Sequence, residues 1–148
     1  MATIKSYTDL EQSKKLAKIL PLESADMYYQ YVLPKSGKII HNPKIGNPIN
    51  ALEWYNKGYT ASGKETITLE EYCVTCWSLA AMLDIITKQG IVELRFLQST
   101  FDNRGNHLTN VWCCTFEDFD TVTLDLYADN AIDACVAMIE KLHELKML

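Results

Sequence analysis

The first pattern along the chain is a helical one. Apolar residues recur at helical spacing from Leu10 to Leu20, and lysines and Glu11 lie largely on the opposite side. Thr8 and Glu11 have the spacing of a capping box, so we expect the helix to begin directly after Thr8. Pro21 ends the pattern because proline cannot continue a helix.

A run of strand-forming residues follows. Residues 27–33 are rich in tyrosine and valine and predict the first strand. Residues 34–37 have turn chemistry, and residues 38–41 are expected to return as a short strand.

Residues 42–64 show no hydrophobic period, and prolines and glycines interrupt them repeatedly. We therefore expect a long irregular segment, of a length that is often functional. It contains Trp54, Tyr55 and Tyr59. These aromatic side chains would form a contact surface if they are exposed, and would hold the loop against the core if they are buried.

The next segment combines two competing patterns. Residues 66–69 alternate and favour a strand, although Thr68 to Glu71 also has the pattern of a helix cap. The residues from Trp77 to Ile86 are apolar nearly all round, which predicts a buried helix over 76–87 that begins near Thr75 or Cys76. Gly90 is placed where a glycine commonly ends a helix.

Strict alternation returns in the last third of the chain and predicts three strands within 91–98, 109–117 and 121–127. Short turns between them favour an antiparallel meander. A helix over 131–145 follows, capped by Asp129 or Asn130. The expected core includes Leu79, Leu83, Ile86, Val136, Ile139 and Leu142.

This order of elements predicts an α+β fold. We expect an antiparallel sheet of about four to five strands, with helices packed mainly on one face, in a single globular domain over residues 1–148.

Composition narrows the class of protein. The 148 residues are 48% hydrophobic and 22% charged, which is typical of a globular domain with one core. The net charge of −5 disfavours binding to nucleic acid, which needs clustered lysine and arginine.

No apolar run reaches the ~18 residues of a membrane span, and the N-terminus lacks the apolar stretch of a signal peptide. Five cysteines, an odd number, favour a reducing compartment, so we expect a cytoplasmic protein without membrane contact.

Three parts of the chain resemble a known family. They are residues 4–17 with 20–27, residues 76–83, and residues 128–135 with 141–148. Together they are similar to small uncharacterised proteins from gut Bacteroides-type bacteria and their phages and mobile elements. The resemblance implies a cytoplasmic protein of phage or mobile-element origin. The family has no assigned activity, so no catalytic residue is carried over, and Ala131 stands where the family has proline.

The clearest candidate for chemistry is the pair Cys73 and Cys76. A C-x-x-C sequence at a helix start can stabilise a thiolate and supports redox chemistry. The surrounding apolar residues favour burial instead, which opposes the thiolate. Cys113 and Cys114 are adjacent on a predicted strand and should point to opposite faces, which disfavours a four-cysteine zinc site. We expect no metal and no cofactor.

The leading hypothesis is a non-enzymatic accessory protein that binds another protein through Trp54, Tyr55 and Tyr59. The alternative is a thiol-dependent redox enzyme that uses Cys73 and Cys76. A weaker alternative is an acidic inhibitor of a nucleic-acid-binding protein. Whether the chain is a monomer or a homodimer is left open.

Overall fold

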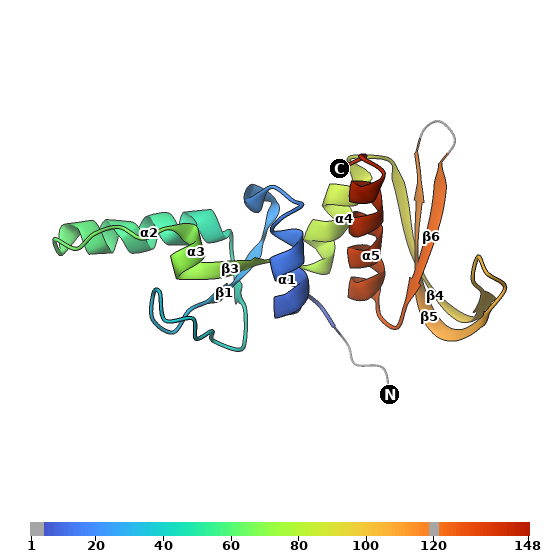
Figure 1. Cartoon of the computed structure of the whole chain (residues 1–148), viewed down its shortest axis with the longest axis horizontal. Coiled ribbons are helices and arrows are strands. Elements are labelled where there is room, and N and C mark those ends of the chain that lie inside the picture. The colour runs from blue at the N-terminus through green and yellow to red at the C-terminus, as the bar shows by residue number, and fades with distance from the viewer. Residues whose placement is uncertain (1–4, 119–121) are drawn as a thin grey trace. The chain divides into compact units, whose positions relative to one another are not determined.

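The computed structural model describes residues 5–118 and 122–148, and for Tyr59 it describes the backbone alone. Within these residues the chain has the predicted α+β class, with helices and antiparallel sheets (Figure 1). The strands form two sheets of three instead of one larger sheet. Internal contacts group into two compact units, one over Asp9–Ser78 and the other over Met1–Thr8 with Leu79–Leu148. A single globular domain over residues 1–148 stays a prediction.

The unit over Asp9–Ser78 is built on a small antiparallel sheet with the strand order β2-β1-β3. Its strands are β1 (Met27–Gln30), β2 (Lys44–Ile45) and β3 (Cys73–Cys76). Its helices are α1 (Leu10–Leu16), the short 3₁₀ helix η1 (Leu22–Ser24), α2 (Pro48–Ala61) and α3 (Leu69–Tyr72). The predicted first strand is confirmed in its first four residues. Beyond it, Tyr31 pairs with Ile39 in an isolated antiparallel bridge, so the chain does return here, but residues 38–41 do not form the predicted strand.

The first helix begins one residue later than predicted. Asp9 is its N-cap: the Asp9 carboxylate accepts from the Gln12 backbone N–H at 2.8 Å, and the Gln12 side chain accepts from the Asp9 backbone N–H at 3.1 Å. The predicted pair, Thr8 and Glu11, is therefore wrong by one position. Both pairs fit the capping pattern, but aspartate is the stronger N-cap and the Thr8 side chain is fully buried.

The predicted irregular segment over 42–64 is wrong, because most of it is the helix α2. Asn47 precedes this helix, and its side-chain oxygen accepts from the backbone N–H groups of Ile49 at 3.0 Å and Asn50 at 3.2 Å. Pro48 takes the first helical position, where its missing N–H costs nothing. The proline that we interpreted as a breaker is therefore a helix-start signal, and Gly58 is tolerated inside the helix.

The last part of the unit over Asp9–Ser78 also differs from the prediction. Thr68 caps the one-turn helix α3, with its hydroxyl accepting from the Glu71 backbone N–H, so the strand expected at 66–69 is wrong. Residues 73–76 then form the strand β3 instead of a helix start. Pairing with β1, some 45 positions earlier in the sequence, decides this conformation. Such a partner is invisible to a local pattern.

The second unit has the predicted meander. Strands β4 (Ile91–Phe101), β5 (His107–Glu117) and β6 (Thr123–Ala128) pair antiparallel in this order. The predicted first residue of the last strand, at position 121, lies outside the described residues. The helices α4 (Leu79–Thr87) and α5 (Ala131–Glu144) lie on one side of this sheet (Figure 1). Asn130 caps α5 by accepting from the Asp133 backbone N–H at 2.9 Å, as predicted.

The core of the second unit lies between the sheet and α5. Phe116, Ile86, Ile139 and Leu142 are fully buried, and Val136 is almost so. Leu79 and Leu83 are only half-buried, so their predicted place in the core is wrong. The buried residues of α4 are Met82, Ile85 and Ile86. A helix that is apolar nearly all round does not indicate by itself which side faces the core.

Candidate functional site

The predicted aromatic surface lies on the helix α2. Trp54 is 76% exposed, and the Lys57 ammonium lies 5.3 Å from the centre of its ring, in a cation–π contact. Tyr55 turns the other way: its ring packs on Tyr72 with 5.0 Å between the centroids. Successive residues of a helix point about 100° apart, which explains the separation. The side chain of Tyr59 lies outside the described part of the chain.

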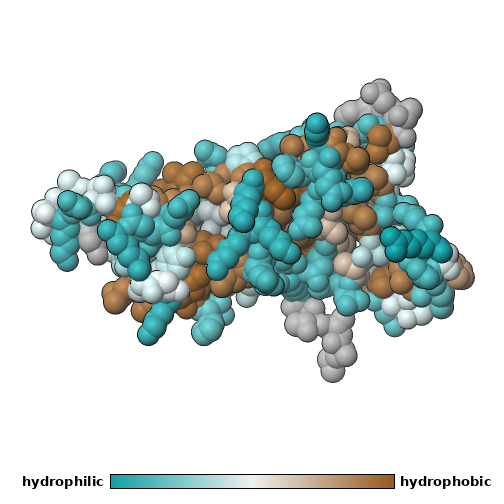
Figure 2. Space-filling model, in the orientation of Figure 1, coloured by the Kyte–Doolittle hydropathy of each residue, from teal (hydrophilic) through white to brown (hydrophobic). Residues whose placement is uncertain are grey.

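Tyr55 therefore contributes to packing. It lies against a buried cluster of Tyr28, Tyr72 and Cys73, together with Leu52 and Ile67. Burial, followed by the neighbouring Tyr28, raises the pKa of the Tyr72 hydroxyl. Of the three predicted residues, the structure presents Trp54 as an exposed aromatic anchor and uses Tyr55 to hold α2 against the sheet. On the face seen in Figure 2, hydrophilic side chains cover much of the surface, with hydrophobic patches between them.

The cysteine pair lacks the geometry that redox chemistry requires. Cys73 and Cys76 lie on the strand β3, not at a helix start, so no helix dipole stabilises a thiolate there. Three positions apart, they point to opposite faces of the strand, and their Cα atoms are about 10 Å apart. A disulfide needs Cα atoms within ~7 Å. Both thiols are buried, and burial raises the pKa of Cys73 to about 12.

The remaining cysteines are also buried. Cys114 faces α5, where a hydrogen bond with Cys135, together with burial, raises the pKa of the Cys114 thiol. Cys113 lies on the other face of β5, with its sulfur 3.6 Å from the Thr115 hydroxyl oxygen. Within residues 5–118 and 122–148, no group of three or more histidine, cysteine or carboxylate side chains is arranged to hold a metal ion.

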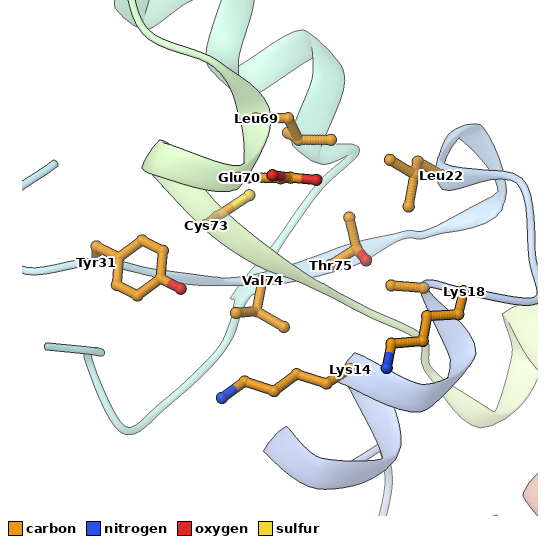
Figure 3. A pocket seen from close by; sticks show the side chains of 10 residues that line it. Lys14, Lys18, Leu22, Tyr31, Leu69, Glu70, Cys73, Val74 and Thr75 are labelled. Atoms are coloured by element: carbon orange, nitrogen blue, oxygen red, sulfur yellow. The ribbon is translucent and has the colours of Figure 1, made fainter. Parts of the chain in front are cut away.

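A cavity of about 410 Å³ lies along β3, inside the first unit (Figure 3). One side is lined by Lys14 of α1 and by Ala17 and Lys18, which directly follow this helix. Leu22, Leu69 and Glu70 lie across from it. Cys73, Val74 and Thr75 of β3 form the floor, and Tyr31 lies at one end.

Sequence reasoning missed this cavity. It assigned Lys14 and Lys18 to a solvated helix face, and it considered Thr75 only as the interior of the C-x-x-C sequence and as a candidate helix start. Thr75 is only 4% exposed, and its hydroxyl oxygen is buried without a hydrogen-bond partner among the described residues. No sequence signal identifies these residues, because the pairing of β1 with β3 brings them together.

Comparisons with protein-family models, curated proteins and solved structures found no match. Among the described residues, no helix has both the length and the apolar character needed to cross a membrane.

Proposed function

We propose that this chain is a non-enzymatic accessory protein that binds another protein, with Trp54 as the main anchor of the interface. The proposal depends on one observation: Trp54, a large aromatic residue on the helix α2, is 76% exposed to water. Tryptophan is among the residues most enriched at interface hot spots. The family resemblance supports an accessory role in a phage or mobile element and a cytoplasmic location.

The surroundings of Trp54 favour binding without a large ordering cost. Its backbone lies within a 14-residue helix that is capped at Asn47 and held against the sheet through Tyr55. The Lys57 ammonium lies over the ring in a cation–π contact. An anchor that is already ordered loses less side-chain entropy when a partner covers it.

The thiol-enzyme alternative is not supported by the site. Its two premises were a cysteine at a helix N-terminus and a pair of thiols close enough to react, and β3 provides neither. The acidic-inhibitor alternative depends on the net charge of −5 alone.

The test is affinity capture from a lysate of the native host with the wild-type chain and with Trp54→Ala. The captured protein is then purified, and its affinity is measured by titration. We expect Trp54→Ala to weaken binding by about 30-fold, which corresponds to the ~2 kcal/mol of a hot spot. Thr60→Ala is the matched control, since Thr60 is another exposed residue of the same helix. A partner that binds the Trp54→Ala variant as tightly as the wild type would exclude Trp54 as the anchor.

Analytical ultracentrifugation of the same samples decides between a monomer and a homodimer. A dimer that dissociates in the Trp54→Ala variant would make a second copy of the chain the partner. A monomer in both variants leaves a different protein as the partner.

A further inference from the structure

The strand β3 forms one edge of its sheet, and its hydrogen-bonding register shows which groups point outward. Among the described residues, β3 pairs with β1 alone, antiparallel, with Tyr28 opposite Thr75 and Gln30 opposite Cys73. The Tyr31 N–H donates to the Tyr72 carbonyl at 3.0 Å, so these two residues form a hydrogen-bonded pair. Such pairs alternate along an antiparallel ladder. The backbone groups of Cys73 and Thr75 therefore point away from β1.

The opposite side of β1 agrees with this register. The Gln30 carbonyl accepts from the Ile40 N–H at 2.9 Å, so it points away from β3. Its cross-strand partner Cys73 must then direct its own backbone groups away from β1 as well. The Cys73 N–H is used internally, because it donates to the Leu69 carbonyl at the end of α3.

Thr75 is left as the unsatisfied residue of this edge. Within residues 5–118 and 122–148, no hydrogen bond is made by its outward N–H, its outward carbonyl or its buried hydroxyl. Buried backbone and hydroxyl groups without partners are costly, and nearly all are paired in native proteins. All three groups lie at the floor of the 410 Å³ cavity, so a ligand there could satisfy them.

The walls of the cavity differ in chemistry. Lys14 and Lys18 lie on the α1 side, and neither forms an ion pair within the described part of the chain. Leu22 and Leu69 lie on the other side, with Glu70 beside them (Figure 3). The two ammonium groups outnumber the one carboxylate of the lining, which favours an acidic ligand.

We propose that this groove binds an extended acidic segment of a partner protein, which adds a fourth strand to the sheet β2-β1-β3 along the outer edge of β3. The backbone of the segment pairs with the outward N–H and carbonyl of Thr75 and with the carbonyl of Cys73. Because side chains alternate along a strand, carboxylates at every second position face Lys14 and Lys18, and apolar side chains between them face Leu22 and Leu69. The four residues of β3 offer room for about 13 Å of extended chain.

The recess of β3 argues against pairing with a second copy of the same strand. The strand residues are at most 9% exposed, since the walls formed by α1 and α3 stand on either side of the edge. Two strands recessed in this way cannot approach to the ~4.8 Å that pairing requires. A flexible segment without walls of its own can enter.

The test uses two synthetic pentapeptides with acetylated and amidated ends, Ac-VEVEV-NH₂ and Ac-VKVKV-NH₂, titrated into the ¹⁵N-labelled full chain. We expect the glutamate peptide to shift the Thr75 amide resonance and to slow its hydrogen exchange at least tenfold. The Val74 amide, which points toward β1, is the internal control and should change little. The lysine peptide should bind at least tenfold more weakly.

Charge-reversal variants test the recognition of the carboxylates. The double substitution Lys14→Glu with Lys18→Glu should reverse the preference, so that the lysine peptide binds more tightly than the glutamate peptide. Lys15→Glu is the matched control, because Lys15 lies on the same helix but does not line the groove. Trp54→Ala should leave peptide binding unchanged, which separates this proposal from the proposed function.

Backbone methylation tests the added strand itself. N-methyl groups on the peptide residues that pair with Thr75 should abolish binding, whereas N-methyl groups on the residues of the other parity should not. Equal binding of both methylated peptides would overturn strand addition, and so would binding of the glutamate peptide without protection of the Thr75 amide. Protection of this amide in a concentration-dependent dimer without peptide would also overturn the proposal, in favour of self-pairing.

Discussion

Gly90 is a position where adding a single methyl group should destabilise the protein. It follows α4 and directly precedes β4, with the backbone at a φ that any residue can adopt. A Cβ atom placed there would lie 2.5 Å from the Glu117 carbonyl oxygen and 2.8 Å from two ring carbons of Phe116. The first neighbour is backbone, and the second is a fully buried ring, so neither can move away easily. This close approach, and not a left-handed helix end, explains the glycine.

The magnitude follows from two opposing effects. Overpacking of a well-filled core typically costs about 1–3 kcal/mol. Replacing glycine by alanine also restricts the unfolded chain, which favours the folded state by about 0.4–1 kcal/mol where the backbone is compatible. We therefore expect Gly90→Ala to lower the free energy of unfolding by roughly 1–2 kcal/mol.

Gly58→Ala is the matched control, and its effect should have the opposite sign. Gly58 lies inside α2, and nothing lies within 4 Å of the position that its Cβ would take. Alanine should stabilise the protein there by about 0.5–1 kcal/mol. Urea unfolding followed by circular dichroism and tryptophan fluorescence measures both changes. A Gly90→Ala variant as stable as the wild type would refute the steric reasoning.

Three further predictions concern caps, core and thiols. Asn47→Ala should destabilise α2 by about 1 kcal/mol, because it removes the acceptor for the Ile49 and Asn50 N–H groups, and urea unfolding measures the loss. Ile139→Ala should lower the free energy of unfolding by about 2–5 kcal/mol, because Ile139 is fully buried. Leu83→Ala should lower it distinctly less, because Leu83 is half-buried. Equal losses in the two variants would contradict the observed orientation of α4. The raised pKa of Cys73, about 12 in the folded chain, means that the unfolded state loses this proton first, at its ordinary value near 9.0. The free energy of unfolding should therefore fall as the pH rises from about 9 to 12, and this thiol should contribute roughly 1.4 kcal/mol per pH unit to the fall. In a Cys73→Ala variant, urea unfolding at a series of pH values should show a shallower fall. Labelling of the native Cys73 thiol should also remain slow up to pH 9 and accelerate on unfolding.

Local patterns were sufficient wherever neighbouring residues decide the structure. The alternation over 91–98 and 109–117 and the short turn between them predicted the meander, because antiparallel neighbours need only a tight connection. Asn130 and the apolar stripe of α5 likewise predicted the last helix, since capping and amphipathic burial are both encoded within a few turns. For α2, the sequence did contain a start signal, Asn47 followed by Pro48, but the proline was interpreted as a breaker.

Only the tertiary structure decided the region around β3 and the candidate sites. Cys73 to Cys76 could have started a helix, but pairing with β1 makes them a strand, and this change removes the geometry of a redox dithiol. The same pairing points the backbone of Thr75 into a groove walled by Lys14 and Lys18, which are distant in the sequence. Trp54 and Tyr55 are adjacent in the sequence, yet the contact of Tyr55 with Tyr72 leaves only Trp54 exposed. Non-local pairing and packing determine which side chains face water, and neither can be predicted from a local pattern of hydrophobic and polar residues.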